Sequence, residues 1–479
     1  MTHPADPAAL FIELYDQLPE EVFLRPDPER WKRDPDVQRH AQRVRAYIQE
    51  FGEADPRQVQ EIIDKDEHRG TFAVLRGIDL ALEIINPWFP SFEYGNLAEL
   101  TSRYVETGRL NASTADGVLL PRGAYPNRPQ GPGGKAAYFG LHRVTAKSWE
   151  KINHGILPAR RGPAFRPGEA VQIGCAPLLE TFEDVTFDPA LPVGYDAFSL
   201  APVDSASLRN RISSVIRKLD DSGAVIGVIP EGTLTDGLLK YWKEEAARTA
   251  AQGKSLRWLL VGTGPLGGDD PPPNRAVLID RLSGKEILAQ DKLAAFVLSA
   301  GQASEWKMPG GPIGRSVAEH ITRGSQVTVL ETALGRLAIV ICEDLSQSAG
   351  WARELIECGI THLFVPIFSK AIIPYRWVGQ AAERLIADTG AWVIVANSLV
   401  VQFAMDPALG DPDWYTCLVA GPQDPDRREY DNFDWQFGSA KAGDDLGLAK
   451  RNGIAKLPEI RAARLYELWV ENPPEPRVR

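Results

Sequence analysis

Three reactive side chains each follow an apolar run that is typical of a buried strand. They are a carboxylate, an ammonium and a thiol, in the chain order Glu231, Lys292 and Cys342. Strand ends at one edge of an α/β sheet are where ligand sites tend to form. Brought to one edge, the thiol could serve as a nucleophile, the carboxylate as its base and the ammonium as a fixed positive charge for an oxyanion. The sequence therefore predicts a nucleophilic site around Cys342.

Each of these residues has an ordinary interpretation when it is taken alone. A strand that emerges into solvent often ends in a charged residue, and most lysines are solvated. A single cysteine after an apolar run is more often an inert buried side chain. What favours chemistry is the combination of all three, in order and each at a strand end.

The three segments resemble the signatures of the nitrilase, or carbon–nitrogen hydrolase, superfamily, which uses a Glu-Lys-Cys triad in this chain order. Ile229-Pro230-Glu231 matches a strand that leads into Pro-Glu, and Asp291-Lys292 matches a lysine after a hairpin strand. Ile341-Cys342-Glu343-Asp344 matches a strand that leads into Cys, with an acidic residue two positions on. Later stretches, 364–366 and 377–398, resemble the family's later helix and strand. The resemblance extends over roughly half the chain.

The resemblance implies a four-layer αββα sandwich of nitrilase type and a thioester mechanism. Cys342 would attack an amide carbonyl while Glu231 takes the thiol proton, since a thiol with a pKa of about 8.5 is mostly protonated at neutral pH. Lys292 and the backbone N–H of Glu343 would hold the developing oxyanion. Glu231 would then protonate the leaving nitrogen and activate water against the thioester, which requires a raised pKa of the kind that burial supplies.

Many members of the family carry a second catalytic glutamate between the lysine and the cysteine. Glu305 is our candidate, because the segment 305–310 (Glu-Trp-Lys-Met-Pro-Gly) resembles the family's Glu followed by a Pro-Gly turn. Glu319 and Glu331 are the alternatives, and we rank both below Glu305, since Glu331 falls within a predicted strand. The ordinary interpretation of Glu305 is a solvated loop charge.

The residues after the cysteine favour amides over nitriles as substrates. In the nitrile-cleaving branch of the family the cysteine is typically followed by Trp-Glu, whereas here Glu343-Asp344 follows, which looks more like amidase-type and glutaminase-type members. The expected activity is hydrolysis of a carbon–nitrogen bond that releases ammonia or an amine and a carboxylic acid. Cys-Glu-Asp is also similar to the glutamine-hydrolysing domains of NAD synthetases, but the chain has no Ser-Gly-Gly-x-Asp loop of an ATP-pyrophosphatase domain.

Two other functions stay open on the sequence alone. The protein could be a catalytically silent scaffold or regulatory module that keeps the fold, or an acyl or amide transferase that uses the same triad. The residues before 169 and the polar stretch after 422 favour the scaffold, because interaction surfaces often arrive as additions. The intact triad favours catalysis. The sequence does not identify the substrate.

The chain changes character near residue 168. Before this point the pattern is helical or irregular, with helices predicted over 36–51 and 71–85 and a third from an Asn96 cap to about Thr107. We expect this region to cover or neighbour the mouth of the active site. We divide the chain into an N-terminal helical and irregular region of unknown role (1–168), a carbon–nitrogen hydrolase domain (169–422) and a C-terminal extension (423–479).

In the predicted hydrolase domain, strands alternate with helices. Two hairpins are expected, one pairing 276–280 with 286–291 and the other pairing 326–332 with 336–342. This rhythm predicts an α/β fold of packed sheets flanked by helices. A helix over 205–219 is expected to bury one face, made of Leu208, Ile212, Val215, Ile216 and Leu219.

The composition is that of a globular protein, with 44% hydrophobic and 24% charged residues among 479. A net charge of −11 disfavours nucleic acid and anionic membranes as partners. We expect a cytoplasmic location, because we find no secretory signal or membrane span in the sequence and the 4 cysteines are too far apart for a disulfide framework.

We expect neither a metal nor a cofactor. The 7 histidines form no H-E-x-x-H or C-x-x-C…H pattern. The expected partner is a small-molecule amide substrate. The family resemblance also implies a homodimer or a larger homo-oligomer.

Overall fold

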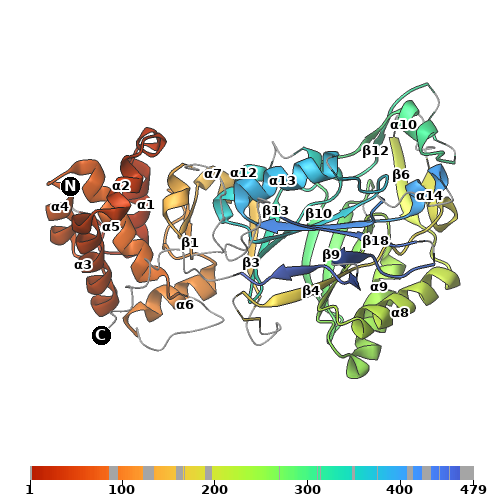
Figure 1. Cartoon of the computed structure of the whole chain (residues 1–479), viewed down its shortest axis with the longest axis horizontal. Coiled ribbons are helices and arrows are strands. Elements are labelled where there is room, and N and C mark those ends of the chain that lie inside the picture. Colours follow the sequence, from red (N-terminus) through yellow and green to blue (C-terminus); the bar gives the residue numbers. More distant parts are fainter. Residues whose placement is uncertain are drawn as a thin grey trace.

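The chain folds into a mixed α/β structure, as the sequence predicts, seen here in a computed structural model (Figure 1). The structure describes residues 3–85, 95–121, 134–157, 165–166, 168–188, 197–268, 270–309, 311–312, 314–347, 351–374, 376–406, 414–422, 433–441, 443–451 and 454–463. No helix in these ranges combines the length and the hydrophobicity that crossing a membrane requires.

Two large sheets lie at the centre of the molecule. Within the described ranges, the six-stranded sheet has the order β10 (Glu286–Asp291), β9 (Asn274–Asp280), β8 (Trp258–Pro265), β7 (Ile226–Val228), β4 (Ala170–Cys175) and β21 (Glu459–Arg461). The nine-stranded sheet has the order β20 (Ile454–Lys456), β19 (Leu448–Arg451), β18 (Phe433–Ser439), β17 (Cys417–Pro422), β16 (Trp392–Asn397), β15 (His362–Ile367), β14 (Gly335–Ile339), β13 (Val327–Thr332) and β3 (Ile152–Ile156). Both predicted hairpins are confirmed, as β9 with β10 and β13 with β14.

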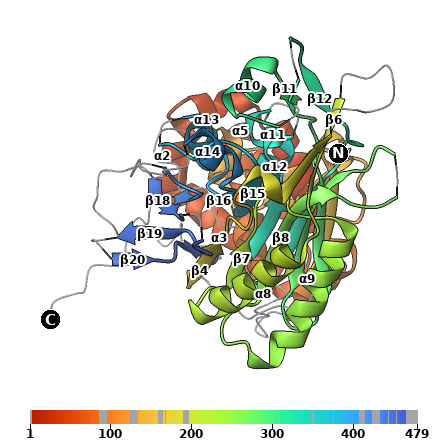
Figure 2. The same cartoon turned by 90° about the vertical axis from the view of Figure 1, so that its right-hand side faces the viewer.

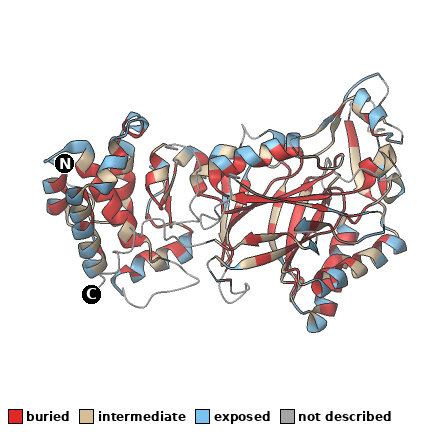
Figure 3. Ribbon diagram, viewed as in Figure 1, coloured by how far each residue is buried: buried red, intermediate tan, exposed pale blue. Residues whose placement is uncertain are grey.

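The two sheets share one hydrophobic core between them. Successive residues of a strand point to opposite faces, so Trp258 and Leu260 of β8 face this shared core while Leu259 and Val261 face the other way. Figure 3 shows the buried residues concentrated in the sheets and on the helix faces turned toward them. This alternation explains why the strands are apolar on both faces.

Helices cover the outer faces of both sheets. On the six-stranded sheet, α8 (Ala206–Asp221) and α9 (Asp236–Thr249) pack against the outward residues of β8 and β9. The buried face of α8 is the predicted one, and Ser205 caps the helix by accepting the N–H of Leu208. On the nine-stranded sheet, α12 (Ala352–Cys358) and α13 (Trp377–Thr389) pack into the core with β15 and β16.

The helices before residue 110 build a separate core around Phe11, Phe72 and Ile78. Aspartates cap four of them, because each carboxylate accepts backbone N–H groups of the first turn. The predicted Asn96 cap is wrong: Leu97 is the N-cap of α6, and the Asn96 amide donates instead to the carbonyl of Glu50. The helices are α1 (Pro7–Gln17), α2 (Asp27–Arg33), α3 (Pro35–Phe51), α4 (Pro56–Ile63), α5 (Glu67–Leu82) and α6 (Ala98–Thr107).

Segments outside 169–422 contribute strands to both large sheets. From the N-terminal side, β3 pairs in parallel with β13. From the C-terminal side, β18 pairs with β17 and β21 pairs with β4, both antiparallel. The domain boundaries at 168 and 422 stay predictions. Strands from before residue 169 and from after residue 422 pair with strands of the segment between these boundaries.

Smaller elements complete the described structure. Figure 2 shows β6, β11 and β12 of a four-stranded sheet beside α10, at the upper edge of that view. The four strands are β5 (Val185–Asp188), β6 (Ala197–Pro202), β11 (Val297–Leu298) and β12 (Val317–Glu319). The remaining described strands and α-helices are β1 (Val118–Leu120), β2 (His142–Val144), α7 (Ala146–Trp149), α10 (Ala300–Glu305), α11 (Glu343–Ser346) and α14 (Val400–Met405).

Candidate active site

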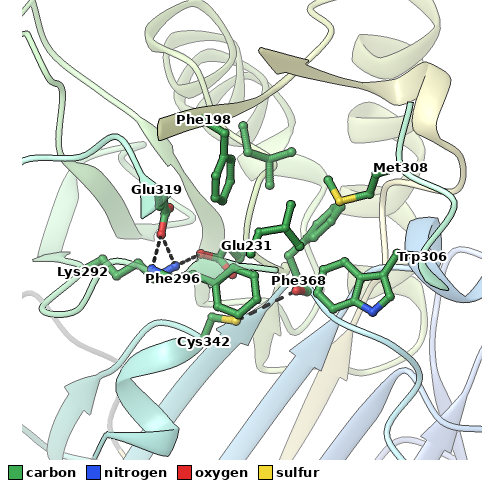
Figure 4. A pocket seen from close by; sticks show the side chains of 11 residues that line it. Phe198, Glu231, Lys292, Phe296, Trp306, Met308, Glu319, Cys342 and Phe368 are labelled. Atoms are coloured by element: carbon green, nitrogen blue, oxygen red, sulfur yellow. Dashed lines mark hydrogen bonds and ion pairs between the residues drawn. The ribbon is translucent and has the colours of Figure 1, made fainter. Parts of the chain in front are cut away.

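The three predicted triad residues meet in one buried cluster. Glu231 follows β7 and Lys292 follows β10 in the six-stranded sheet, whereas Cys342 follows β14 in the nine-stranded sheet. Their exposed fractions are 3% for Glu231, 1% for Lys292 and 7% for Cys342. Figure 4 shows the three side chains converging on the floor of one pocket. Strand ends from both sheets therefore supply the reactive groups.

The Lys292 ammonium lies between two carboxylates. Its Nζ donates to Glu231 Oε1 at 2.7 Å and to Glu319 Oε2 at 2.6 Å. The Asn274 amide bridges the same two carboxylates, donating to Glu231 Oε1 at 3.0 Å and to Glu319 Oε1 at 2.8 Å. Two buried acids thus share one ammonium and one amide, which fixes the geometry of the cluster.

Cys342 sits in a strained backbone conformation. Its φ is +46° and its ψ is −100°, a combination that L side chains rarely adopt and that costs about 1–3 kcal/mol. The turn connects β14 to the short helix α11, and the Cys342 N–H donates to the carbonyl of Pro366 at 3.0 Å. The thiol lies 4.0 Å from the carbonyl oxygen of Phe368. Neighbouring strand β15 therefore holds the turn that presents the sulfur to the pocket.

The electrostatics of the cluster keep the thiol protonated and the lysine charged. Burial, together with the negative charge of Glu231, raises the pKa of the Cys342 thiol well above its usual value. Burial also raises the pKa of Glu231, although Lys292 opposes it. For Lys292 burial alone would lower the pKa, but Glu231 and Glu319 outweigh it and hold the pKa well above its ordinary value.

The Cys342 thiol is therefore paired with Glu231, a group that can accept its proton. A hydrogen bond between the Cys342 thiol and the Glu231 carboxylate contributes to the pKa of both groups. A carboxylate whose pKa is raised can accept a proton and give it back, which is what a general acid–base group must do. The arrangement can form a thiolate at the moment of attack rather than store one.

Asp344 ties the lysine segment to the cysteine turn, a contact that the sequence did not single out. This fully buried carboxylate accepts the N–H groups of Leu293 at 3.1 Å and Ala294 at 2.7 Å, directly after Lys292. It also accepts the N–H of Ile341 at 3.1 Å, directly before the nucleophile. Burial raises the pKa of Asp344 to about 7 against these hydrogen bonds. The only sequence signal was its place two residues after the cysteine.

The structure places the two candidate second glutamates differently from our ranking. Glu305, at the end of α10, is half-exposed and forms an ion pair with Lys370. Glu319, on the short strand β12, is the carboxylate that contacts Lys292 and lines the pocket. Glu331 belongs to a different buried ion cluster, with Arg336 and His154. The structure thus brings Glu319, and not Glu305, into contact with Lys292 at the pocket, and the catalytic role of either glutamate stays a prediction.

Glu343 occupies the first position of α11. The first N–H groups of a helix have no acceptor within that helix, so this N–H is available in principle to an oxyanion. Its role as an oxyanion donor stays a prediction. Within the described residues, no group of three or more histidine, cysteine, aspartate or glutamate side chains is arranged to hold a metal ion.

The N-terminal helices lie far from the pocket. Figure 1 shows α1 to α5 at one end of the molecule and the pocket elements β6, β12 and α10 at the other. The expectation that the N-terminal region covers the active-site mouth is therefore wrong for these helices. They pack instead beyond the edge of the nine-stranded sheet that carries β3.

Comparisons with known proteins place the chain near solved structures of the nitrilase superfamily. It is similar to an amidase from Nesterenkonia sp. (14% identity, TM-score 0.35, covering 63% of this chain and 89% of that one). It is also similar to Saccharomyces cerevisiae Nit3, a member of branch 10 of the nitrilase superfamily (12% identity, TM-score 0.34, 63% and 93%). A glutamine-dependent NAD(+) synthetase from Cytophaga hutchinsonii is a further neighbour (16% identity, TM-score 0.32, 56% and 42%).

No family model matches the chain, and neither does any curated protein sequence. At the identities and TM-scores of the solved structures, the chemistry of the site has to be inferred from its own geometry.

Proposed function

We propose that this protein is a nitrilase-type amidase that hydrolyses the carbon–nitrogen bond of a carboxamide through a cysteine thioester. The observation that carries the proposal is the buried cluster in which the Cys342 thiol, the Glu231 carboxylate and the Lys292 ammonium meet at one pocket. The outer helices and the core shared by the two sheets support the four-layer αββα sandwich of that family. No cofactor enters the proposed reaction.

Acylation begins with attack of the Cys342 sulfur on the amide carbonyl carbon. The S–C bond forms as the thiol proton moves to Glu231, and the carbonyl oxygen becomes an oxyanion facing Lys292 and the Glu343 N–H. The C–N bond then breaks, and Glu231 gives its proton to the leaving nitrogen. Ammonia or an amine departs, and a thioester on Cys342 remains.

Deacylation uses the same carboxylate in the opposite sense. Glu231 takes a proton from water as the water oxygen attacks the thioester carbon. The S–C bond breaks, the proton returns to the sulfur, and a carboxylic acid leaves. One base suffices for both halves because its raised pKa lets it cycle between charged and neutral forms.

Glu319 is proposed as the second glutamate of the site in place of Glu305. Its contact with Lys292 at 2.6 Å keeps the ammonium charged and aimed at the pocket while Glu231 changes its protonation state. We assign it a positioning role, since it acts through Lys292. Asp344 is a second positioning residue, because it fixes the backbone on both sides of the cluster.

Ammonia release from a panel of primary amides and the matching nitriles tests the proposal. The wild type should release ammonia from amides in preference to nitriles, and Cys342→Ala should release none while keeping the wild-type circular dichroism spectrum. Cys358→Ala is the matched control, because Cys358 is equally buried but lies in α12, outside the pocket. Undiminished release by Cys342→Ala overturns the proposal.

A further inference from the structure

As far as the structure describes it, the wall of the pocket is apolar apart from the reacting groups. Eleven described side chains line it, four of which belong to the cluster of Glu231, Lys292, Glu319 and Cys342. The aromatic lining residues are Phe198, Phe296, Trp306 and Phe368. The aliphatic ones are Leu200, Leu298 and Met308. A substrate whose carbonyl reaches Cys342 must therefore lay its acyl group against carbon.

The charged side chains lie toward one side of the pocket, and Trp306 and Met308 lie on the opposite side. Figure 4 shows Lys292 and Glu319 on one side and Trp306 and Met308 on the other, with Cys342 on the floor. The apolar side comes from β6, from the segment around α10 and from the residue after β15. The amide group would thus meet the polar side while the acyl chain extends toward Trp306 and Met308.

The charged lining groups are already engaged with one another. Glu319 accepts from Lys292, from Asn274 and from the backbone N–H of Phe296 at 3.2 Å. Lys292, the sole cation among the described lining residues, serves two carboxylates. A carboxylate on the acyl side of the substrate would find no unpaired cation among the described lining residues and would face the two acids Glu231 and Glu319.

Two lysines neighbour the lining residues along the chain, and neither is among the described residues that line the pocket. Lys307, between Trp306 and Met308, donates to the carbonyl of Met405 at 3.2 Å. Lys370, two residues after Phe368, pairs with Glu305. Burying an unpaired carboxylate costs far more than burying an alkyl group of the same shape, so the pocket selects against charged acyl groups.

We infer that the substrates are uncharged carboxamides whose acyl group is an apolar alkyl or aryl chain. This inference rests on the proposed amidase function and sharpens it. It also predicts that glutamine is a poor substrate, because glutamine carries both an ammonium and a carboxylate on its acyl side.

A matched pair of amides tests the inference. Succinamate and 4-methylpentanamide have the same shape, but the first ends in a carboxylate and the second in an isopropyl group. Wild-type kcat/KM should favour 4-methylpentanamide by at least about 100-fold, since an unpaired buried charge is expelled and each well-packed methylene contributes about tenfold or more. Glutamine should be as poor as succinamate. Equal rates for the pair, or a preference for succinamate or glutamine, overturn the inference and leave the amidase function standing.

A charge placed in the wall should change this preference. Met308→Lys adds a cation on the apolar side and should shrink the 4-methylpentanamide preference at least about tenfold. Val297→Lys is the matched control, because Val297 precedes the lining residue Leu298 but is 56% exposed, and it should leave the ratio unchanged. An unchanged ratio in folded Met308→Lys counts against the inference. If neither amide releases ammonia and no amide gives Cys342-dependent release, the proposed function fails, and this inference with it.

Discussion

Two buried ion clusters, each built around a glutamate and a cation, behave in opposite ways. The pocket cluster consists of Glu231, Lys292, Glu319 and Cys342 at the strand ends. The strand cluster consists of His154, Glu331 and Arg336 on β3, β13 and β14 of the nine-stranded sheet. In the strand cluster Glu331 accepts from Arg336 and interacts with His154 at 3.1 Å.

The balance of charge distinguishes the two clusters. In the pocket cluster two carboxylates share one ammonium, and burial leaves the pKa of Glu231 raised. In the strand cluster one carboxylate faces a guanidinium and an imidazole. Burial alone would raise the pKa of Glu331, but Arg336 and His154 outweigh it and lower it to about 2. Glu231 is therefore set to exchange a proton, and Glu331 to remain charged.

The residues around the two clusters also differ, in a way that matches this difference in charge. The Arg336 guanidinium also donates to the carbonyls of Cys358 and Pro121, so the strand cluster links separate segments. The pocket cluster opens onto a cavity instead and contains a thiol. Burial of charge does not by itself identify a functional site; an excess of acid beside a nucleophile and a cavity does.

Removing the base should give the largest effect on catalysis. Glu231→Gln keeps the shape of the side chain but cannot take the thiol proton, so kcat should fall by about 10³-fold. Glu331→Gln is the matched control in the strand cluster and should leave the kcat of the folded protein unchanged. Steady-state ammonia release measures both. A Glu231→Gln variant with near wild-type kcat would remove the distinction between the clusters.

Removing the strand-cluster cation should give the largest effect on stability. Arg336→Met leaves Glu331 buried without its guanidinium, which typically costs about 3–5 kcal/mol. The melting temperature should fall clearly, while kcat at a temperature where the protein stays folded should not change. Thermal melts and ammonia release on the same preparation test this. A variant that melts like the wild type but loses turnover would place Arg336 in catalysis instead.

Acid should reduce the stability that the strand cluster contributes to the folded protein. The pKa of Glu331 is depressed in the folded state, so its stabilising contribution is present above the unfolded pKa and is lost as pH falls from 4.5 toward about 2. The whole contribution is about 3 kcal/mol, by conversion of the shift. Melting temperatures between pH 6 and pH 3 should therefore converge for the wild type and Glu331→Gln.

The stability contributed by the pocket cluster should depend on pH in the opposite direction. The pKa of Glu231 is raised in the folded state, so the stability linked to it is lost as pH rises through that pKa. Relative to Glu231→Gln, the wild type should lose stability on going from acid to neutral pH. A pH series in which both variants shift in the same direction would contradict the comparison.

The smallest predicted change separates the two candidate second glutamates. Glu319→Gln weakens the grip on Lys292 and should lower kcat by about 100-fold with a smaller change in KM, because misplacing a catalytic group has this scale of effect. Glu305→Gln should stay within about twofold of the wild type, since Glu305 is a half-exposed partner of Lys370. Equal losses in both variants would restore Glu305 to the site.

The sequence predicts those parts of the site that are marked by a local pattern around each residue. Glu231, Lys292 and Cys342 each end an apolar run, and strand ends of packed sheets meet, so their convergence follows from the pattern. The buried face of α8 and both hairpins are predicted for the same reason, because periodicity and turn residues are local signals.

The contacts that the sequence did not reveal depend on long-range pairing. Glu319 sits on the short strand β12, which lies between β11 and β6 in its sheet, and β6 comes more than a hundred residues earlier in the chain. The Asp344 contacts with the segment after Lys292 are likewise formed only once the two sheets pack. The distance of α1 to α5 from the pocket is also a property of the tertiary arrangement.

The most direct test of the central claim is the fate of Cys342 during turnover. Wild type and Cys342→Ala are incubated with 4-methylpentanamide and quenched in acid, and ammonia and intact protein mass are measured in the same samples. We predict ammonia and one acyl group, mapped by digestion to Cys342, in the wild type and neither in Cys342→Ala. Ammonia release by folded Cys342→Ala, or an acyl group on another residue, would contradict the account.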